Sequence, residues 1–361
     1  MADNEFRRRL NNASNGRDIE TLSKNDHESS SSQPTTRFTL SSRSRSSKFG
    51  LYVIAITAVV IFFSSDIHVD MEKNVSWFPM MQTHTMLQNV STTDEIESTL
   101  KREHIRVHGD KIEENAKLQL RSLAETYSLT YKIIHELQKQ YIDVTLTFGS
   151  HLGALRHHGV IPFEEKDVDL AVFSTNVKKI RRAIHTAIST KPHLNLTFIE
   201  TDFGFQIPAT KELHTYIDVW MFKISAGQKY TTCVGHQLRS KSCLKWYRDF
   251  HDKNPPVYLY NSWYPFRTEY FGTERVPIPA TNKPIESFHF DDGGPNFWNI
   301  TCGPDRRWNE TEERWVKVNM KERKCSDKYK MYPFVFLKEK GIEQLRQGSI
   351  ILHELPGVSK K

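Results

Sequence analysis

Apolar residues within 120–137 recur at spacings of three and four, and this period predicts a helix with one buried face. The next apolar run, 142–148, alternates and is rich in β-branched residues, which predicts a strand that ends at Gly149 and Ser150. Residues 151–159 predict a short helix that a glycine terminates. The pattern thus gives helix, strand and helix in succession.

The same alternation between strands and helices continues toward the middle of the chain. Residues 168–173 predict a second strand, and an amphipathic helix follows it with Asn176 as its candidate N-cap. Three more strands are predicted at 194–200, 203–207 and 215–224. This order predicts an α+β fold, in which a mixed sheet is packed with helices.

The N-terminal part of the chain has a different pattern. Residues 1–48 are rich in Ser, Asn, Arg and Thr and lack apolar periodicity, which predicts a disordered tail. Residues 49–65 are uncharged and mostly apolar, and a membrane-spanning helix needs roughly 17 to 25 such residues. We expect a single N-terminal transmembrane helix there, an uncleaved signal anchor. A buried core helix and a cleaved signal peptide are less favoured alternatives.

The charges on either side of this run predict its orientation. Arginines and a lysine precede it, and three acidic residues follow it within seven positions. By the positive-inside rule, the tail 1–48 is expected in the cytosol, followed by a lumenal stem at 66–109 and a lumenal domain at 110–361. The prediction is a single-pass type II protein of the Golgi or ER membrane.

Cysteines and glycosylation sequons agree with a lumenal domain, because all four cysteines and five sequons follow residue 65. The sequons begin at Asn74, Asn89, Asn195, Asn299 and Asn309. Two disulfides are expected among three possible connectivities, and the simplest pairs Cys233 with Cys243 and Cys302 with Cys325. A zinc site at Cys233, His236 and Cys243 is the alternative, although structural zinc usually shows tighter paired spacing.

Overall charge argues against one class of partner. The formal net charge is +7 over 361 residues, and no element concentrates the basic residues. Proteins that bind nucleic-acid duplexes usually gather such charge on one face or helix. We therefore expect no nucleic-acid partner, and the sequence leaves the oligomeric state open.

Three aspartates lie inside the predicted strands. Asp167 and Asp169 are two residues apart, so a strand projects both from the same face. Neighbouring carboxylates repel each other unless a proton or a cation separates them, and Mg²⁺ prefers such oxygen ligands. Asp218 occupies the centre of a later strand, and the three converge if the two strands are neighbours. A solvated strand edge and an exposed turn are the structural alternatives.

Two further features are less specific. Gly149 and Ser150 at a strand end allow backbone N–H groups to approach a phosphate, and the serine adds a hydroxyl. Aromatic residues are dense from Trp246 to Phe266, where core packing is favoured over stacking on a nucleobase or sugar.

Taken together, "FGSHLGALRHHGVIPFEEKDVDLAVF" resembles the LicD/fukutin family, within the DNA polymerase beta-like nucleotidyltransferase superfamily. A looser resemblance extends through "TEYFGTERVPIPATNKPIESFHFDDGG", so that about residues 115 to 300 are covered. The matching positions are Gly149, Ser150, Leu152, Gly153, Arg156, Gly159, Ile161, Pro162, Asp167 and Asp169. The resemblance implies a nucleotidyltransferase-like mixed sheet.

The resemblance also implies an activity, namely metal-dependent transfer of an alditol phosphate or similar phospho-group from a CDP-activated donor onto a glycan or glycoprotein acceptor. Asp167, Asp169 and Asp218 are the expected catalytic and metal-binding residues, with Mg²⁺ or Mn²⁺ as cofactor. Gly149, Ser150 and Arg156 are the expected substrate-binding residues.

The chain also departs from the family pattern. His151 replaces a leucine, Lys166 interrupts the acidic run before Asp167, and "HFDD" from His289 replaces a Tyr-Gly pair. Two alternatives therefore stay open, a glycosyltransferase that uses Asp-x-Asp with a sugar nucleotide and a lumenal family member without catalytic activity.

Overall fold

The computed structural model describes the chain from Leu87 almost to its end. Contacts divide the chain into residues 1–80 and 81–361, and the first unit lies outside the described residues, as do the predicted tail and anchor. The described residues are 87, 90–163, 167–224, 230–233, 258–282, 302–309, 311–312, 314–321, 323–337 and 342–355.

The predicted fold class is wrong in its membrane part. No helix in the described ranges is long and apolar enough to cross a membrane. The longest of them, α4 (Glu114–Lys139), carries charged residues along its length, among them Arg121, Glu125 and Glu136. The run 49–65, on which the expected transmembrane helix rested, lies outside the described residues. What the structure describes is a mixed α/β arrangement of sheets and helices.

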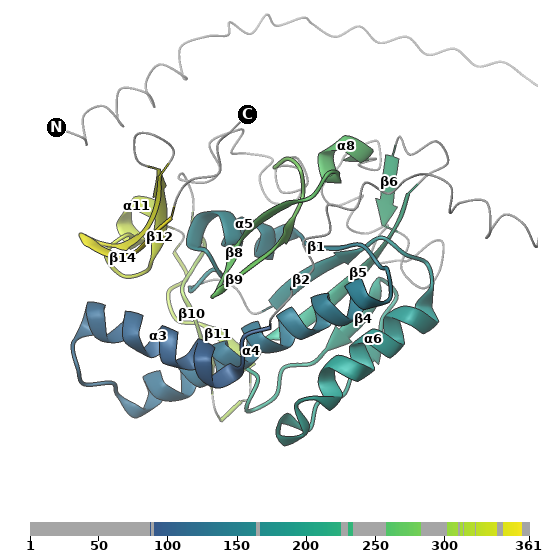
Figure 1. The fold of residues 1–361 in the computed structure, drawn as a ribbon. Helices are drawn as coiled ribbons and strands as arrows, with labels where there is room; N and C mark the ends of the chain where they lie inside the picture. The colour runs from purple at the N-terminus through teal and green to yellow at the C-terminus, as the bar shows by residue number, and fades with distance from the viewer. Residues whose placement is uncertain are drawn as a thin grey trace, which may run out of the picture. The chain divides into compact units, whose positions relative to one another are not determined.

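The largest sheet has seven strands and carries the predicted aspartates (Figure 1). Five of the strands lie in the order β1-β2-β5-β4-β3, in which only β2 and β5 are parallel. Strands β6 and β7 extend the sheet beyond the end of β5. The bounds are β1 Val144–Leu146, β2 Asp167–Val172, β3 Ile199–Glu200, β4 Gly204–Ile207, β5 Tyr216–Ile224, β6 Tyr230–Cys233 and β7 Tyr258–Leu259.

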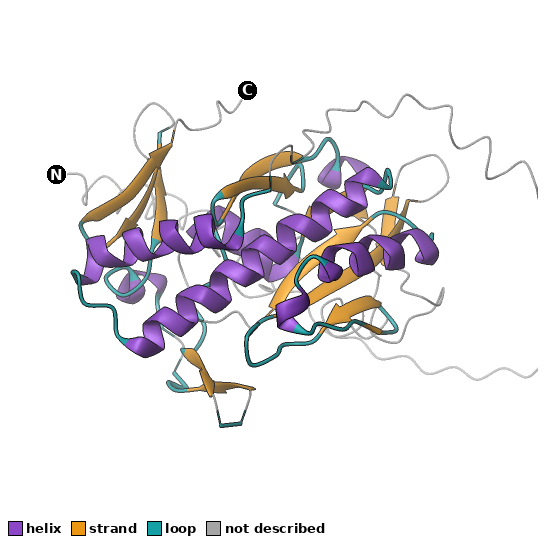
Figure 2. Cartoon of the chain, turned by 60° about the horizontal axis from the view of Figure 1, so that its bottom comes forward, coloured by secondary structure: helices purple, strands orange, loops and turns teal. Residues whose placement is uncertain are grey.

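Helices cover one face of this sheet. Both α4 and α6 (Val177–Ser189) contribute buried apolar residues to the same core as the sheet. Figures 1 and 2 show these helices lying over the strands. Asn176 is the N-cap of α6, as predicted, and its side chain accepts a hydrogen bond from the Lys179 N–H.

Helix α3 (Thr93–His108) is a difference from the expected irregular stem at 66–109. Its cap explains why it forms, because the Thr92 and Glu95 side chains make a reciprocal capping box at its start. Behind the cap, Ile96 is fully buried in the main core. The folded part of the chain therefore begins before residue 110.

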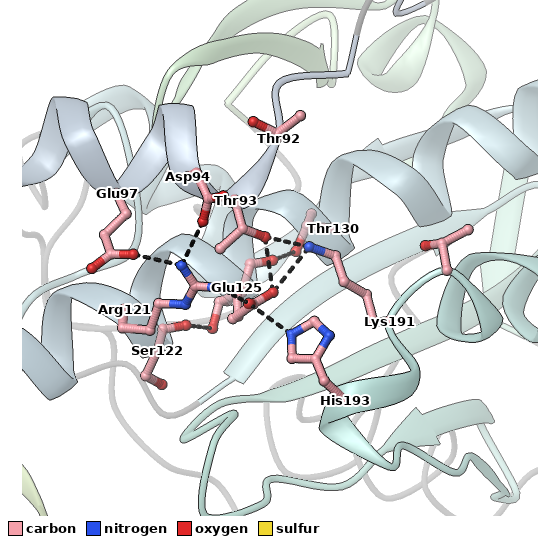
Figure 3. Close-up of polar contacts among 12 residues, drawn as sticks. Thr92, Thr93, Asp94, Glu97, Arg121, Ser122, Glu125, Thr130, Lys191 and His193 are labelled. Carbon is pink, nitrogen blue, oxygen red and sulfur yellow. Dashed lines mark hydrogen bonds and ion pairs between the residues drawn. The ribbon is translucent and has the colours of Figure 1, made fainter.

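A buried carboxylate ties α3, α4 and the chain after α6 together (Figure 3). The Glu125 side chain is 2% exposed and accepts hydrogen bonds from Thr93 at 2.9 Å and from Lys191 at 2.9 Å. Arg121 and His193 contact its other oxygen at 3.1 and 3.0 Å. Burial raises the pKa of Glu125, but the hydrogen bonds from His193 and Lys191 lower it overall. The carboxylate thus holds three segments in place as an anion.

Smaller elements surround the sheet. Two hairpins, β8–β9 and β10–β11, and a three-stranded sheet in the order β12-β13-β14 follow along the chain. Their bounds are β8 Arg267–Phe271, β9 Glu274–Ile278, β10 Arg306–Asn309, β11 Arg314–Lys317, β12 Phe334–Leu337, β13 Glu343–Gln347 and β14 Ile350–Leu355. The short helices are α5 Phe148–His157, η2 Pro192–Leu194, α8 Tyr260–Trp263 and α11 Cys325–Lys328.

Two predicted strands are shorter than the pattern suggested. Residues 142–148 give only three strand residues in β1, because α5 already begins at Phe148. Of 194–200, only Ile199–Glu200 is strand, since Pro192 starts a 3-10 turn that ends at Asn195 in the left-handed region. The other predicted strands and helices are confirmed to within a few residues.

Candidate active site

Two neighbouring strands bring the predicted aspartates together. Strands β2 and β5 are parallel, and their register places Asp169 directly opposite Asp218 and Asp167 opposite Tyr216. Both Asp169 and Asp218 are 8% exposed, and Asp167 is half-buried. Adjacent strands lie about 4.8 Å apart, so the paired carboxylates are immediate neighbours on one face.

The alternation of residue types in β2 and β5 explains this arrangement. Val168 and Leu170 in β2 and Ile217 and Val219 in β5 are fully buried in the core shared with α4 and α6. Since successive residues of a strand point to opposite faces, the acidic positions between them point away from that core. The apolar face thus determines where the carboxylates lie.

Neutral donors hold the two paired carboxylates in position. The Trp220 indole donates from Nε1 to Oδ1 of Asp169 at 3.0 Å, and the Gln206 amide donates to Oδ1 of Asp218 at 2.8 Å. Trp220 is itself fixed by stacking on Phe203, with ring centroids 4.2 Å apart. Because these donors carry no charge, they orient the carboxylates without neutralising them. Such a set of oxygen ligands suits Mg²⁺ or Mn²⁺.

The start of α5 adjoins the same strand. The Thr147 N–H donates to the Asp169 carbonyl at 3.0 Å, and the Ser150 hydroxyl accepts from the Asp169 N–H at 2.8 Å. Gly149 and Ser150 therefore lie in the first turn of a helix rather than at a strand end. Phe148, which precedes them, has a φ of 47°, in the left-handed region that a phenylalanine rarely adopts.

This helix start has consequences for phosphate binding. The first N–H groups of a helix lack partners within the helix, and they carry the positive end of its dipole. In α5 these groups belong to the turn that contains Gly149 and Ser150, which is bonded to the Asp169 backbone. The N-terminal end of α5, where helices offer free N–H groups to anions, is thus held beside the carboxylates by contacts with the Asp169 backbone.

The third predicted substrate-binding residue lies elsewhere. Arg156 is 4% exposed, in the last turn of α5, where its guanidinium contacts His157 at 2.9 Å and the sulfur of Cys325 at 3.8 Å. Phe163 lies beneath it, 5.9 Å from the guanidinium carbon. Burial and the neighbouring Arg156 charge lower the pKa of His157 well below its ordinary value. The structure therefore places Arg156 in the packing around a disulfide, two turns of helix from Ser150.

Aromatic residues near the site pack as a core. Within the part of the aromatic run that is described, Trp263 is fully buried and its ring contacts Phe173 and Phe222. The Tyr264 hydroxyl donates to Asp143 at 3.0 Å, and burial and the Asp143 charge raise the pKa of Tyr264 well above its ordinary value. The favoured explanation, core packing, holds for these residues.

Two residues at the site were not identified from the sequence. Trp220 and Gln206 orient the carboxylates, and Trp220 could have been found because it follows Asp218 by two positions on the same strand face. His151, which replaces a family leucine, is fully buried, and burial together with the Arg267 charge lowers its pKa well below the ordinary value. It is a neutral core residue of α5.

The disulfide and sequon predictions divide between described and undescribed residues. Cys302 and Cys325 form a disulfide, and Cys233 is also disulfide-bonded, which leaves no thiolate there for a zinc ion. Asn195 is exposed, whereas the Asn309 side chain is half-buried and bonded to Glu312. Outside the described residues lie Asn74, Asn89, Asn299, Cys243, His236, Lys166 and the segment from His289.

Comparisons with known proteins identify the region that contains this site. A model described as "LicD/FKTN/FKRP, nucleotidyltransferase domain" matches residues 141–281, which include β1, β2, β5 and α5. No curated protein matches the chain.

Solved structures give weaker similarities. Two structures of the antibiotic-resistance factor ANT(2'')-Ia, one of them in complex with adenylyl-2''-tobramycin, are 14% and 15% identical, with TM-scores of 0.21 and 0.22. They cover 27% and 29% of this chain and 51% and 50% of their own chains.

A third structure is Vibrio cholerae DncV cyclic AMP-GMP synthase with a linear intermediate, at 14% identity and a TM-score of 0.20. The match covers 44% of this chain and 51% of that one, so this chain spans about half the length of each of these proteins. The family match does not depend on these low scores. Residues 141–281 of this chain match the LicD/FKTN/FKRP nucleotidyltransferase domain model, which supports a transferase of the nucleotidyl- or phosphotransferase type.

Proposed function

We propose that this chain transfers an alditol phosphate or a similar phospho-group from a CDP-activated donor onto a glycan or glycoprotein acceptor. The observation that carries the proposal is the register of β2 and β5, which sets Asp169 opposite Asp218. Two paired carboxylates, with Asp167 on the same face, offer the oxygen ligands required by a divalent cation that also binds the diphosphate of the donor.

The donor set fits a divalent cation on physical grounds. Asp169 and Asp218 are both nearly buried and immediate neighbours, and each accepts a hydrogen bond from a neutral donor. Like charges in that position repel unless a cation lies between them. Asp167, Asp169 and Asp218 would hold Mg²⁺ or Mn²⁺, which supplies charge neutralisation for the diphosphate when bound.

The protein's own residues account for the rest of the transfer. The acceptor hydroxyl oxygen attacks the phosphorus that bears the alditol, a new P–O bond forms, and the P–O bond to CMP breaks as CMP departs. The hydroxyl proton passes to a carboxylate, and Asp218 is the candidate base where Asp167 and Asp169 alone hold the cation. The N-terminal turn of α5 contributes N–H groups to a donor phosphate, and the Ser150 hydroxyl holds this turn to the Asp169 N–H.

The cysteines support a cellular setting for the proposed reaction. A disulfide between Cys302 and Cys325 and a further disulfide at Cys233 are typical of oxidising compartments. Exposed Asn195, at the start of a sequon, is compatible with glycosylation there. We place the proposed reaction in the lumen of the secretory pathway, in the ER or Golgi.

One assay tests the proposal and the glycosyltransferase alternative together. The purified chain is incubated with CDP-alditols, CDP-choline, UDP-sugars or GDP-sugars and a panel of glycan acceptors, with and without Mg²⁺ or Mn²⁺, and nucleotide release is measured. The expected result is metal-dependent CMP release that Asp169→Asn abolishes and that Asp110→Asn, at an exposed loop position, leaves unchanged. Release of UDP or GDP, or CMP release that survives Asp169→Asn, contradicts the proposal.

A further inference from the structure

A histidine far along α5 from the carboxylates is surrounded by acidic groups. His158 is the C-cap of α5, with a φ of 51°, and its side chain is only 1% exposed. Its Nε2 has no hydrogen-bond partner among the described residues. That nitrogen lies 3.9 Å from Oε1 of Glu269 and 3.5 Å from Oε2 of Glu343. One ligand atom from each of the three residues lies within 4.8 Å of the others.

The other ring nitrogen of His158 has a partner outside this cluster. His158 Nδ1 lies 2.9 Å from Nε2 of His353, and His353 Nδ1 lies 3.6 Å from a Glu103 carboxylate oxygen, which is too long for a hydrogen bond. A neutral His158 that donates from Nδ1 to His353 directs the lone pair of its Nε2 at Glu269 and Glu343.

A histidine nitrogen and two carboxylates meet here in a largely buried place, and together they form a ligand set that a divalent cation can occupy. A histidine whose second nitrogen is fixed by an outer partner is the usual arrangement of a metal ligand. His353 is that outer partner here.

We propose that His158, Glu269 and Glu343 bind a divalent transition-metal ion of the zinc class. Zinc binds histidine nitrogen and carboxylate oxygen at about 2.0 to 2.2 Å, which in a tetrahedral site separates ligand atoms by roughly 3.4 Å. The two separations from Nε2, 3.5 and 3.9 Å, are close to this value, and all three ligand atoms lie within 4.8 Å of one another. The nitrogen ligand selects against Mg²⁺ and Ca²⁺, which prefer oxygen alone.

The origin of the ligands indicates what the ion does. His158 ends α5 and Glu269 lies in β8, both within the family domain, whereas Glu343 lies in β13 of the C-terminal sheet. A metal at this position fastens that sheet to the transferase domain and stabilises the folded chain, because only the folded chain brings the ligands together. His158 and His353 also line a cavity of about 950 Å³.

Zinc binding to the full chain tests this proposal. Asp169→Asn serves as the background, so that zinc held by the proposed catalytic carboxylates is removed from the measurement. Zinc per chain is measured after dialysis, and affinity by competition with a chromophoric chelator. We expect one equivalent in the background chain, an at least 10-fold weaker affinity when Glu343→Gln or Glu269→Gln is added, and no change with the matched control Glu312→Gln, an exposed residue of the β10–β11 turn.

Two further measurements exclude the remaining explanations. Thermal melts of the same chains are compared with and without zinc, and a zinc-dependent rise in Tm is expected in the background chain and lost with Glu343→Gln. Unchanged zinc affinity after Glu343→Gln, absence of bound zinc in the background chain, or an identical rise in Tm in both chains overturns the proposal; a protonated His158 bridging the two glutamates then explains the geometry. The transferase assay in Mg²⁺ is separate, so failure here leaves the proposed function untouched.

Discussion

Replacing Trp220 by phenylalanine tests how the candidate active site is built. The change removes the Nε1–H that donates to Asp169 at 3.0 Å and retains a ring that can stack on Phe203, 4.2 Å away, and meet Phe148 edge-on. A hydrogen bond to a charged group contributes about 1.5 to 3 kcal/mol. At about 1.4 kcal/mol per factor of ten, that is roughly a 10- to 150-fold effect, and loss of an outer-shell partner typically costs about 10- to 100-fold in metal affinity.

The expected result is an apparent Mn²⁺ affinity about 10- to 100-fold weaker in Trp220→Phe, with most of the CMP release recovered at high Mn²⁺. This recovery distinguishes a positioning residue from one that touches the substrate. Mn²⁺ binding is measured by calorimetry and turnover by CMP release across a metal titration. The matched control is Trp315→Phe. The Trp315 indole, on the β10–β11 hairpin, donates to the His214 carbonyl at 2.6 Å and so loses a comparable hydrogen bond away from the site. Unchanged Mn²⁺ affinity in Trp220→Phe, or an equal loss in Trp315→Phe, refutes the assigned role.

Three further predictions concern stability. Ser150→Ala leaves the buried Asp169 N–H without its acceptor and should lower the free energy of unfolding by about 1 to 3 kcal/mol in urea titrations, whereas Ser150→Thr retains the acceptor. Glu125→Gln should cost about 3 to 5 kcal/mol at neutral pH. Since the folded pKa of Glu125 is lowered, its contribution is full above its ordinary pKa of 4.5 and is lost as pH falls through the folded pKa, so the variant and the parent should converge in acid. Reducing the Cys302–Cys325 disulfide, which spans 23 positions, should cost about 3 kcal/mol in chemical denaturation.

The face of each aspartate could be predicted from the sequence, but their alignment could not. Alternation in 167–172 and 216–224 assigns each side chain to a face of its strand, and the structure follows that pattern. The register of the two strands could not be predicted in this way. Between them in the sequence lie α6, η2, β3 and β4, and the packing of these elements decides which residues of β2 and β5 become opposite. A shift of one residue would have put Asp218 opposite Val168 or Leu170.

Helix α3, which precedes the predicted domain, has a helix-start signal in its sequence. Thr92 and Glu95 are three positions apart and form the capping box of α3, which is a pattern visible in the sequence. Its polar composition instead favoured a stem. In the structure, Thr93 and Ile96 are the buried residues of this helix. The contacts that stabilise it, from Glu125 to Thr93 and from Arg121 to Asp94, come from α4 and depend on tertiary packing.

The motif after β1 contributes residues to two separate places in the molecule, one at each end of the short helix α5. Ten residues at about 1.5 Å each give α5 a length of roughly 15 Å. Its first turn, with Ser150, is bonded to the backbone of Asp169, and its last turn carries Arg156 to the disulfide and His158 to Glu269 and Glu343. Residues that match the same family motif therefore do not all act at the same site. Substitutions in the first turn should change donor turnover, whereas those in the last turn should change how firmly the C-terminal sheet is held. A chain in which Arg156→Lys abolished CMP release without lowering Tm would refute that division.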